Sequence, residues 1–158
     1  TSVAVLKGEG LALLSSFSMG GGHISSDIMQ LLGMNFKDAE LIKRKIILTI
    51  EPQHNEYYEI RTKDSLIKAP IGMTNQIVKS RIESLAKVIG EILAIDPVFK
   101  NYQLYLTGDG IANFKGVKTI LKKQTNMDVE LYSNMFDTSG NKMQTSLQGL
   151  VTLNDMII

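Results

Sequence analysis

Two short glycine-rich segments carry the strongest chemical signal in this sequence. Gly20-Gly21-Gly22 and Gly108-Asp109-Gly110 each follow an apolar strand pattern and precede a helical one. Glycine lets the backbone approach a ligand closely, and a helix that begins there offers free N–H groups and a positive dipole end. The pair therefore fits contact with the phosphate or purine of a nucleotide. The alternative is that these glycines only make tight turns before helices.

Residues suited to catalysis or metal binding are few. The chain has no cysteine and only two histidines, His23 and His54, which excludes disulfides and thiolate metal sites. No P-loop lysine motif is present. Asp27 and Asp38 fall on solvated helical positions, and His23 suits a cap or packing group better than a base. We expect no catalytic residue and no metal site in this chain.

Three charged residues on one short helical pattern are candidates for ligand contacts. Lys37, Glu40 and Lys43 could reach a ribose or a base edge. Charge pairs spaced by three on a short helix are also typical of a solvated surface, so this pattern alone favours the solvated interpretation.

The composition of the whole chain excludes two classes of partner. Its 158 residues are 44% hydrophobic and carry a net charge of +1, enough for one globular body and too neutral to attract nucleic acid. The apolar stretches 45–50 and 104–106 fall far short of the roughly 20 residues that span a bilayer. We expect a cytoplasmic protein. The first residue is Thr1 rather than Met, and a strand pattern begins directly after it. The chain ends on the apolar residues 156–158, so we also expect that both ends are cut from a longer chain.

Hydrophobic spacing predicts the elements that position these residues. In the first half we expect a β-hairpin around a glycine turn, a helix from Gly22 to Gly33, a short helix with Asn35 as its N-cap, and a small sheet. The hairpin strands are Val3–Lys7 and Leu11–Phe17, and the sheet pairs Ile46–Ile50 with Tyr57–Ile60.

The second half repeats the strand, glycine turn and helix. A long helix over 75–95 ends at Asp96-Pro97, and strand 103–106 leads through the second glycine turn into a helix that carries Phe114, Val117 and Leu121. A strand at 129–132, a polar turn at 137–141 and a closing helix with Leu147, Leu150, Val151 and Leu153 complete the prediction. The two β-turn-α units around an insert suggest an α/β body made from both ends of the chain, with a smaller subdomain between them.

Four stretches of the sequence resemble a known family. Residues 1–5 are similar to the tail of a second phosphate loop, and residues 17–28 to a Gly-Gly-x-His-Ile-Thr-x-Asp-Ile segment. Residues 36–43 look like an acidic-Ala-Glu-x-x-Lys helix, and residues 104–116 look like the adenosine loop Thr-Gly-Gly-Gly-x-x-x-x-Gly. Together they resemble FtsA, the actin-like ATPase family of bacterial cell division, over essentially the whole chain.

The resemblance implies a fold and a site. The fold is an actin-like ATPase (ribonuclease H-like) lobe with an inserted smaller α+β subdomain, the body being 1–20 and 100–158 and the nucleotide-side subdomain 21–99. It implies that adenosine is faced by Gly21, Lys37, Glu40, Gly108, Gly110 and Ile111, with Thr1 beside the phosphates. Asp109 belongs to the same loop but replaces its middle glycine, which adds a Cβ and a negative charge where glycine would supply positive φ. Lys115 also stands where a proline is usual.

The resemblance also implies what the complete protein does. It would bind ATP with Mg²⁺, polymerise head to tail, tether the FtsZ ring protein to the inner face of the cell membrane and recruit later division proteins. Its membrane contact would use a C-terminal amphipathic helix that is not in this chain. A pilus-assembly relative of the PilM type, a sugar kinase of the same superfamily and an adaptor that binds no nucleotide are the alternatives.

Overall fold

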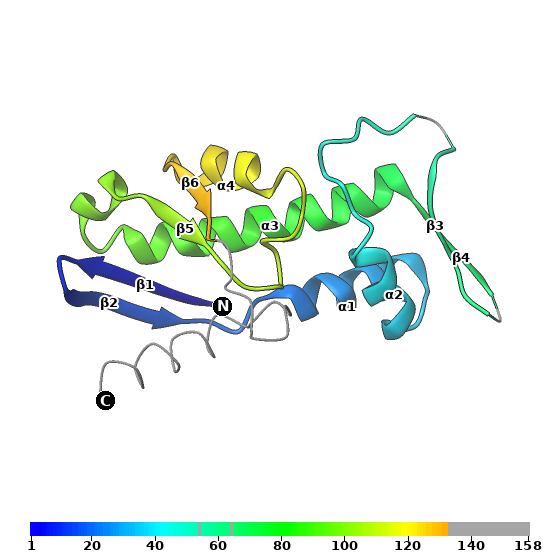
Figure 1. Cartoon of the computed structure of the whole chain (residues 1–158), viewed down its shortest axis with the longest axis horizontal. Coiled ribbons are helices and arrows are strands. Elements are labelled where there is room, and N and C mark those ends of the chain that lie inside the picture. The colour runs from blue at the N-terminus through cyan, green and yellow to red at the C-terminus, as the bar shows by residue number, and fades with distance from the viewer. Residues whose placement is uncertain (54, 64, 133–158) are drawn as a thin grey trace, which may run out of the picture.

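One long helix, α3 (Ile71–Leu93), runs along the molecule, and the other elements gather around it (Figure 1). The computed structural model describes residues 1–53, 55–63 and 65–132. The predicted polar turn at 137–141 and the closing helix lie outside the described residues. Along α3, buried apolar residues recur at helical spacing, which confirms the predicted long helix: Val78, Ile82, Leu85 and Ile89.

The predicted hairpin is confirmed at the beginning of the chain. Strands β1 (Ser2–Lys7) and β2 (Gly10–Ser16) pair antiparallel, with a bulge between Val5 and Leu6. Gly8 has φ 62° in the turn, the left-handed conformation that favours glycine. Val3 and Val5 face the core and are buried, whereas Leu6 and Leu14 are exposed on the other face.

Two helices follow the hairpin and pack on each other. Helix α1 (Gly21–Leu32) begins at the first glycine segment and ends at Gly33, whose φ of 64° closes it. Helix α2 (Phe36–Lys43) has the predicted N-cap, because the Asn35 side chain accepts a hydrogen bond of 2.9 Å from the Asp38 backbone N–H.

A bidentate ion pair joins α1 to α3. Nε and Nη2 of Arg81 donate to the two carboxylate oxygens of Asp27 at 2.6 and 2.7 Å. Both side chains are less than a third exposed. Asp27 is thus a helix-to-helix contact, and the prediction that it is merely solvated is wrong.

The small sheet has a different partner from the one expected. Strand β3 (Tyr57–Arg61) pairs antiparallel with β4 (Leu66–Pro70), and no strand forms over Ile46–Ile50. Instead Ile47 makes an isolated parallel bridge to Lys115, and the Leu48 N–H donates to the Lys115 carbonyl at 3.0 Å. The apolar pattern of this segment reflects burial of Ile46 and Leu48 in the core rather than pairing in a sheet.

A buried polar network holds that irregular segment in place. The Tyr58 hydroxyl donates to Asn75 Oδ1 at 2.8 Å and accepts from the Ile47 N–H at 3.0 Å. Asn75 Nδ2 in turn donates to the Ile47 carbonyl at 3.0 Å. Since Tyr58 lies on β3 and Asn75 on α3, one set of hydrogen bonds joins the sheet, the long helix and the segment between them.

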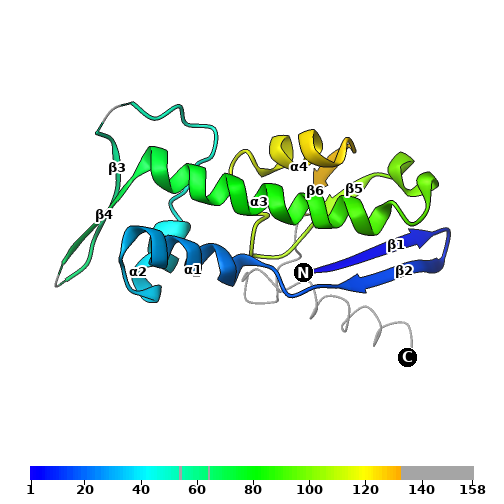
Figure 2. The ribbon, with the colours of Figure 1, turned by 180° about the vertical axis from the view of Figure 1, so that it is seen from behind.

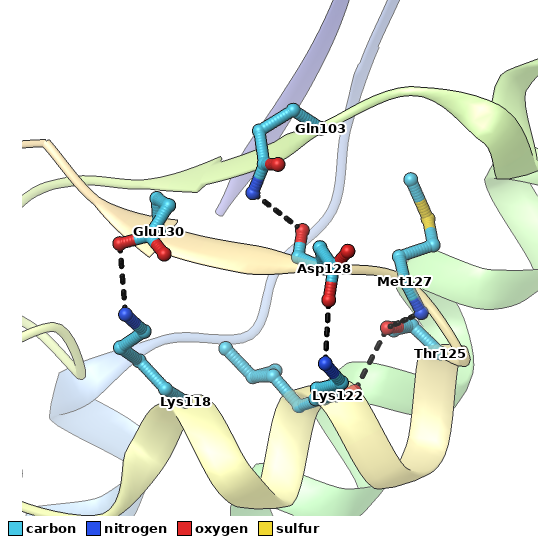
Figure 3. Close-up of polar contacts among 8 residues, drawn as sticks. Gln103, Lys118, Lys122, Thr125, Met127, Asp128 and Glu130 are labelled. Atoms are coloured by element: carbon cyan, nitrogen blue, oxygen red, sulfur yellow. Dashed lines mark hydrogen bonds and ion pairs between the residues drawn. The ribbon is translucent and has the colours of Figure 1, made fainter.

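The second β-turn-α unit follows α3. After a short 3₁₀ helix, η1 (Pro97–Asn101), strand β5 (Leu104–Leu106) pairs parallel with β6 (Val129–Leu131), and α4 (Val117–Thr125) connects them. Figure 3 shows two ion pairs between α4 and the strand edge, Lys118–Glu130 at 2.8 Å and Lys122–Asp128 at 2.5 Å. Gln103 also donates to the Asp128 carbonyl at 2.9 Å. These contacts fix α4 against β6, although exposed pairs of this kind contribute little stability.

The described part of the chain therefore contains three two-stranded sheets, β1–β2, β3–β4 and β5–β6. Figure 2 shows the β3–β4 hairpin at one end of α3 and the β1–β2 hairpin beside its other end. The division into a body and an inserted subdomain remains a prediction, and α3 passes alongside elements of both.

Candidate functional site

The two glycine segments meet in space. A Cβ built on Gly21 would lie 2.8 Å from Cα and 3.1 Å from the carbonyl oxygen of Gly110, and a Cβ on Gly110 would lie 3.3 Å from the Gly21 nitrogen. Real Cβ atoms essentially never lie within 3.0 Å of a backbone atom, so Gly21 requires glycine, and a Cβ on Gly110 would push the Gly21 backbone away by a few tenths of an ångström. We call Gly20, Gly21, Gly108, Asp109 and Gly110 the glycine corner.

The second segment of the corner shows why Asp109 is tolerated. Gly108 has φ 93°, and among the described residues the only non-glycine positions with positive φ are Asn55 and Asn126. Asp109 is therefore unstrained, which corrects the expectation that its place in the turn needs positive φ. Its side chain is exposed and accepts a 3.5 Å hydrogen bond from Asn113. The property of Asp109 that bears on ligand binding is therefore its negative charge, which lies between Gly108 and Gly110.

Thr1 lies beside the glycine corner. Its hydroxyl donates to the Met19 carbonyl, and its amino nitrogen donates to the carbonyls of Phe17 and Met19, both at 3.0 Å. A Cβ on Gly20 would lie 3.7 Å from the Thr1 hydroxyl oxygen. Thr1, Gly21, Gly110 and Ile111 all line one cavity of about 470 Å³ that opens at the corner.

That cavity is not itself suited to a charged ligand. It runs from the corner between β1 and β5, and its lining includes no charged side chain. Ile111 is buried and packs in the core. The polar groups of the site lie instead on the α1–α2 side of the corner.

A hydrogen-bonded cluster joins α2 to the start of α1. Lys43 Nζ donates to the Gly21 carbonyl at 3.3 Å and to Ser25 Oγ at 2.8 Å, and it forms an ion pair with Glu40. The Ser25 hydroxyl, fully buried, also contacts Glu40 and lies 3.3 Å from the Gly21 carbonyl. We call Ser25, Glu40 and Lys43 the α2 cluster.

The structure places the candidate contact residues of α2 differently from one another. Glu40 lies next to the corner, whereas Lys37 is exposed on the first turn of α2 and makes none of these contacts. Their contact with adenosine stays a prediction. Lys43 takes the position beside Gly21, and its side chain is only 12% exposed. His23 is exposed and neither caps α1 nor packs in the core, contrary to expectation.

The charge of Glu40 is set by its neighbours. Burial raises the pKa of the Glu40 carboxyl, but hydrogen bonds from Lys43 and Ser25, with the charges of Lys43 and Arg44, outweigh burial and lower the pKa below its ordinary value. The carboxylate is therefore ionised at neutral pH and accepts hydrogen bonds only.

This lowered pKa predicts an acid-dependent loss of stability. A carboxyl whose pKa is lower in the folded state stabilises the fold above its unfolded pKa of about 4.3, and this contribution is lost as pH falls through the folded pKa. Glu40→Gln should therefore have a lower Tm than the unmodified chain at pH 7, and the difference should shrink below about pH 4. Thermal melts from pH 7 to pH 3 measure it. The exposed Glu91→Gln is the control, and an equal pH profile for both variants would contradict the prediction.

Within the described residues no group of three or more histidine, cysteine or acidic side chains is placed to hold a metal ion. None of the helices in the same part of the chain has the length and apolar character needed to span a membrane. Of the predicted site residues, Thr1, Gly21, Gly110 and Ile111 lie together along one cavity, and Glu40 lies beside Gly21 through Ser25 and Lys43.

Solved structures share the fold of this chain. MreB 5 of Spiroplasma citri matches in its AMPPNP-bound form with a TM-score of 0.67 at 14% identity, covering 82% of this chain and 44% of that chain. Its ADP-bound form gives a TM-score of 0.64 at 15% identity and covers 84% and 45%. The ethanolamine utilization protein EutJ from Carboxydothermus hydrogenoformans gives 0.59 at 18% identity and covers 82% and 39%. The fold is that of an actin-like ATPase lobe, as predicted.

The family follows from the sequence. A family model described as cell division protein FtsA matches residues 1–149. The chain belongs to the FtsA family. No curated protein matches it. The chain spans 39% to 45% of the length of the similar solved structures, so the activity and partners of a whole protein are treated below as proposals.

Proposed function

We propose that this chain is the adenosine-side lobe of an ATP-binding scaffold of bacterial cell division. The observation that carries the proposal is the contact of Gly21 with Gly110 directly beside the α2 cluster. A glycine corner exposes backbone without side chains, and the adjacent Glu40 carboxylate and Lys43 ammonium supply hydrogen bonds of both kinds.

In this proposal each part of the site has its own role. The purine and the ribose would lie against the outside of the glycine corner, where Gly21 contacts Gly110. Glu40 would accept from ribose hydroxyls, and Lys43 would balance the carboxylate and hold the Gly21 carbonyl in place. Thr1 would adjoin the phosphates. ATP itself would lie between two lobes and bridge them. We assign no hydrolysis step and no Mg²⁺ ligand to the described residues.

The proposal also includes a role in the cell. The lobe would belong to a protein that polymerises head to tail, recruits FtsZ and later division proteins, and lies at the inner face of the cell membrane through a segment outside this chain. Membership of the FtsA family supports this role, and the AMPPNP-bound and ADP-bound forms of MreB 5 support nucleotide binding on this fold. Closure of two lobes on a nucleotide is a known way to change a subunit interface.

Nucleotide binding to the chain can be tested by NMR. With only the adenosine side present, we expect ATP to bind with a Kd on the order of 1 mM, and titration should shift the amide signals of Gly21, Gly108 and Gly110. Adenosine should shift the same signals, because the contacts lie on the nucleoside. Absence of these shifts up to about 10 mM ligand would overturn the proposal and favour the adaptor that binds no nucleotide.

Asp109 should weaken this binding through its charge. Asp109→Asn removes one negative charge from the corner without changing side-chain size, so the affinity for ATP should rise about threefold, as expected for an exposed charge. The gain should disappear for uncharged adenosine and shrink at high salt. The same NMR titration measures it, with Glu9→Gln in the β1–β2 turn as the control. Equal gains for adenosine and ATP would contradict a purely electrostatic effect.

A further inference from the structure

The segment that follows α2, residues 46–50, connects the two halves of the candidate site. We call it the bridging segment. It begins at the α2 cluster, because the Ile46 N–H donates to the Lys43 carbonyl at 3.3 Å. It also contacts the loop that carries the second glycine segment, because the Leu48 N–H donates to the Lys115 carbonyl at 3.0 Å. Only a few residues therefore separate the α2 cluster from this loop.

The bridging segment packs closely against the end of that loop. Gly116, where α4 begins, has φ 98°, a conformation that favours glycine. A Cβ built there would lie 2.9 Å from Thr49 Cγ2 and 3.3 Å from Leu48 Cβ. Leu48 itself is buried. Because the two pieces of chain are in direct contact, a displacement of one displaces the other.

A hydrogen-bonded turn carries this contact back to the glycine corner. The Phe114 N–H donates to the Ile111 carbonyl at 3.2 Å, and Ile111 follows Gly110 directly. The loop is thus held at two points, by Gly21 at the corner and by the bridging segment at Lys115. A loop held at one point can rotate about it, whereas a second point fixes its orientation. Binding sites need such support from residues outside them.

Side chains hold the bridging segment in its place. The Ile47 N–H donates to the Tyr58 hydroxyl at 3.0 Å, and the Ile47 carbonyl accepts from Asn75 Nδ2 at 3.0 Å. Tyr58 and Asn75 are both buried. Within the described residues the segment belongs to none of the three sheets and makes only the isolated bridge to the loop. Its position therefore depends on these two side chains.

We propose that Tyr58 is a positioning residue for the nucleotide site, because its hydroxyl fixes the second glycine segment relative to the α2 cluster through the bridging segment. Tyr58 lies on β3 and belongs neither to the glycine corner nor to the α2 cluster. The affinity for nucleotide then depends on the β3–β4 hairpin, and by linkage a bound nucleotide strengthens the attachment of the hairpin to the bridging segment. This inference rests on the proposed nucleotide site.

Tyr58→Phe tests the role of the hydroxyl, since it keeps the ring. We expect the Kd for ATP, from the NMR titration of Gly108 and Gly110, to rise about fivefold. Exchange of the Leu48 amide should become about tenfold faster even without ATP. Ile67→Val is the control, because it trims a buried side chain of the same hairpin and keeps the hydroxyl. An unchanged Kd in Tyr58→Phe, or an equal rise in Ile67→Val, would overturn the proposal.

A disulfide provides a rescue experiment within one protein. The chain has no cysteine, and Ile47 and Lys115 are bridge partners. Such partners lie about 5 Å apart, within reach of a disulfide. In Tyr58→Phe that also carries Ile47→Cys and Lys115→Cys, oxidation should tighten ATP binding about fivefold, because the new bond replaces the lost hold on Ile47. Reduction should reverse the gain. Equal affinities of the oxidised and reduced forms would show that the bridging segment does not position the site.

The unmodified chain separates failure of this inference from failure of the proposed site. If ATP shifts no amide signal of the glycine corner there, the nucleotide site and the positioning role are overturned together. If ATP shifts those signals and Tyr58→Phe binds it as tightly as the unmodified chain, only the positioning role is overturned.

Discussion

Gly21→Ala should lower the free energy of unfolding by about 2 kcal/mol, the cost typical of overpacking a closed contact. Its Cβ would lie 2.8 Å from the Gly110 Cα, and backbone cannot move aside as a flexible side chain can. The loop after β5 must therefore shift, so the NMR response of Gly108 and Gly110 to ATP should also be lost. Urea denaturation followed by circular dichroism gives the first quantity.

Gly22→Ala is the matched control for Gly21→Ala. The two glycines are adjacent on α1, but beyond the neighbouring backbone of α1 no atom of the described residues lies within 4 Å of a Cβ built on Gly22. Alanine there should be neutral or stabilising by up to about 1 kcal/mol, because it reduces the entropy of the unfolded chain and favours the helix. Equal destabilisation by both substitutions would show that the contact with Gly110 is not what requires glycine.

Asn75→Ala should destabilise the chain by about 3 kcal/mol, more than a typical single substitution. Asn75 is 3% exposed, and its amide joins the Tyr58 hydroxyl to the Ile47 carbonyl. Without it, two buried polar groups lose a partner and a small void is left beside α3. The exposed Asn101→Ala should cost less than about 0.5 kcal/mol. Chemical denaturation of both variants compares them.

Tyr58→Phe separates the hydrogen bonds from the packing. It keeps the ring of Tyr58 but removes the hydroxyl that bonds to Asn75 and to the Ile47 N–H. If the network carries the effect, the double variant should cost less than the sum of the single ones, since both break the same bonds. Additive costs would mean that volume, not hydrogen bonding, explains the loss at Asn75.

Local signals explain which elements the sequence predicts well. The hairpin, α1, α2 with its Asn35 cap and α3 each carry their own period, turn or cap within a short window. The partner of β3 could not be found this way. Residues 46–50 have the apolar composition of a strand, whereas β4 carries Lys68 and ends in Pro70, which weakens its strand signal although it is the segment that pairs.

The candidate site, too, could be predicted only in part from local sequence patterns. Each glycine segment is visible in the sequence, but the contact of Gly21 with Gly110 depends on how α1 and β5 are placed by the core between them. The two lysines of α2 are a second example, because Lys37 lies three residues before Glu40 and Lys43 three residues after it. Spacing alone cannot choose between them. The packing of α2 on α1 decides, because it brings Lys43 to the Gly21 carbonyl.

Because α3 is one long unbroken helix, a small tilt of it displaces its far end by a larger distance. Its 23 residues extend over about 35 Å, and Arg81, near its middle, is fastened to α1 through Asp27. A tilt of about 5° about one end would move the other end by roughly 3 Å. For a pivot at the Leu93 end of α3, a displacement of α1 passed on through Asp27 and Arg81 would be larger at the β3–β4 hairpin, which leads directly into the first turn of α3 (Figure 1).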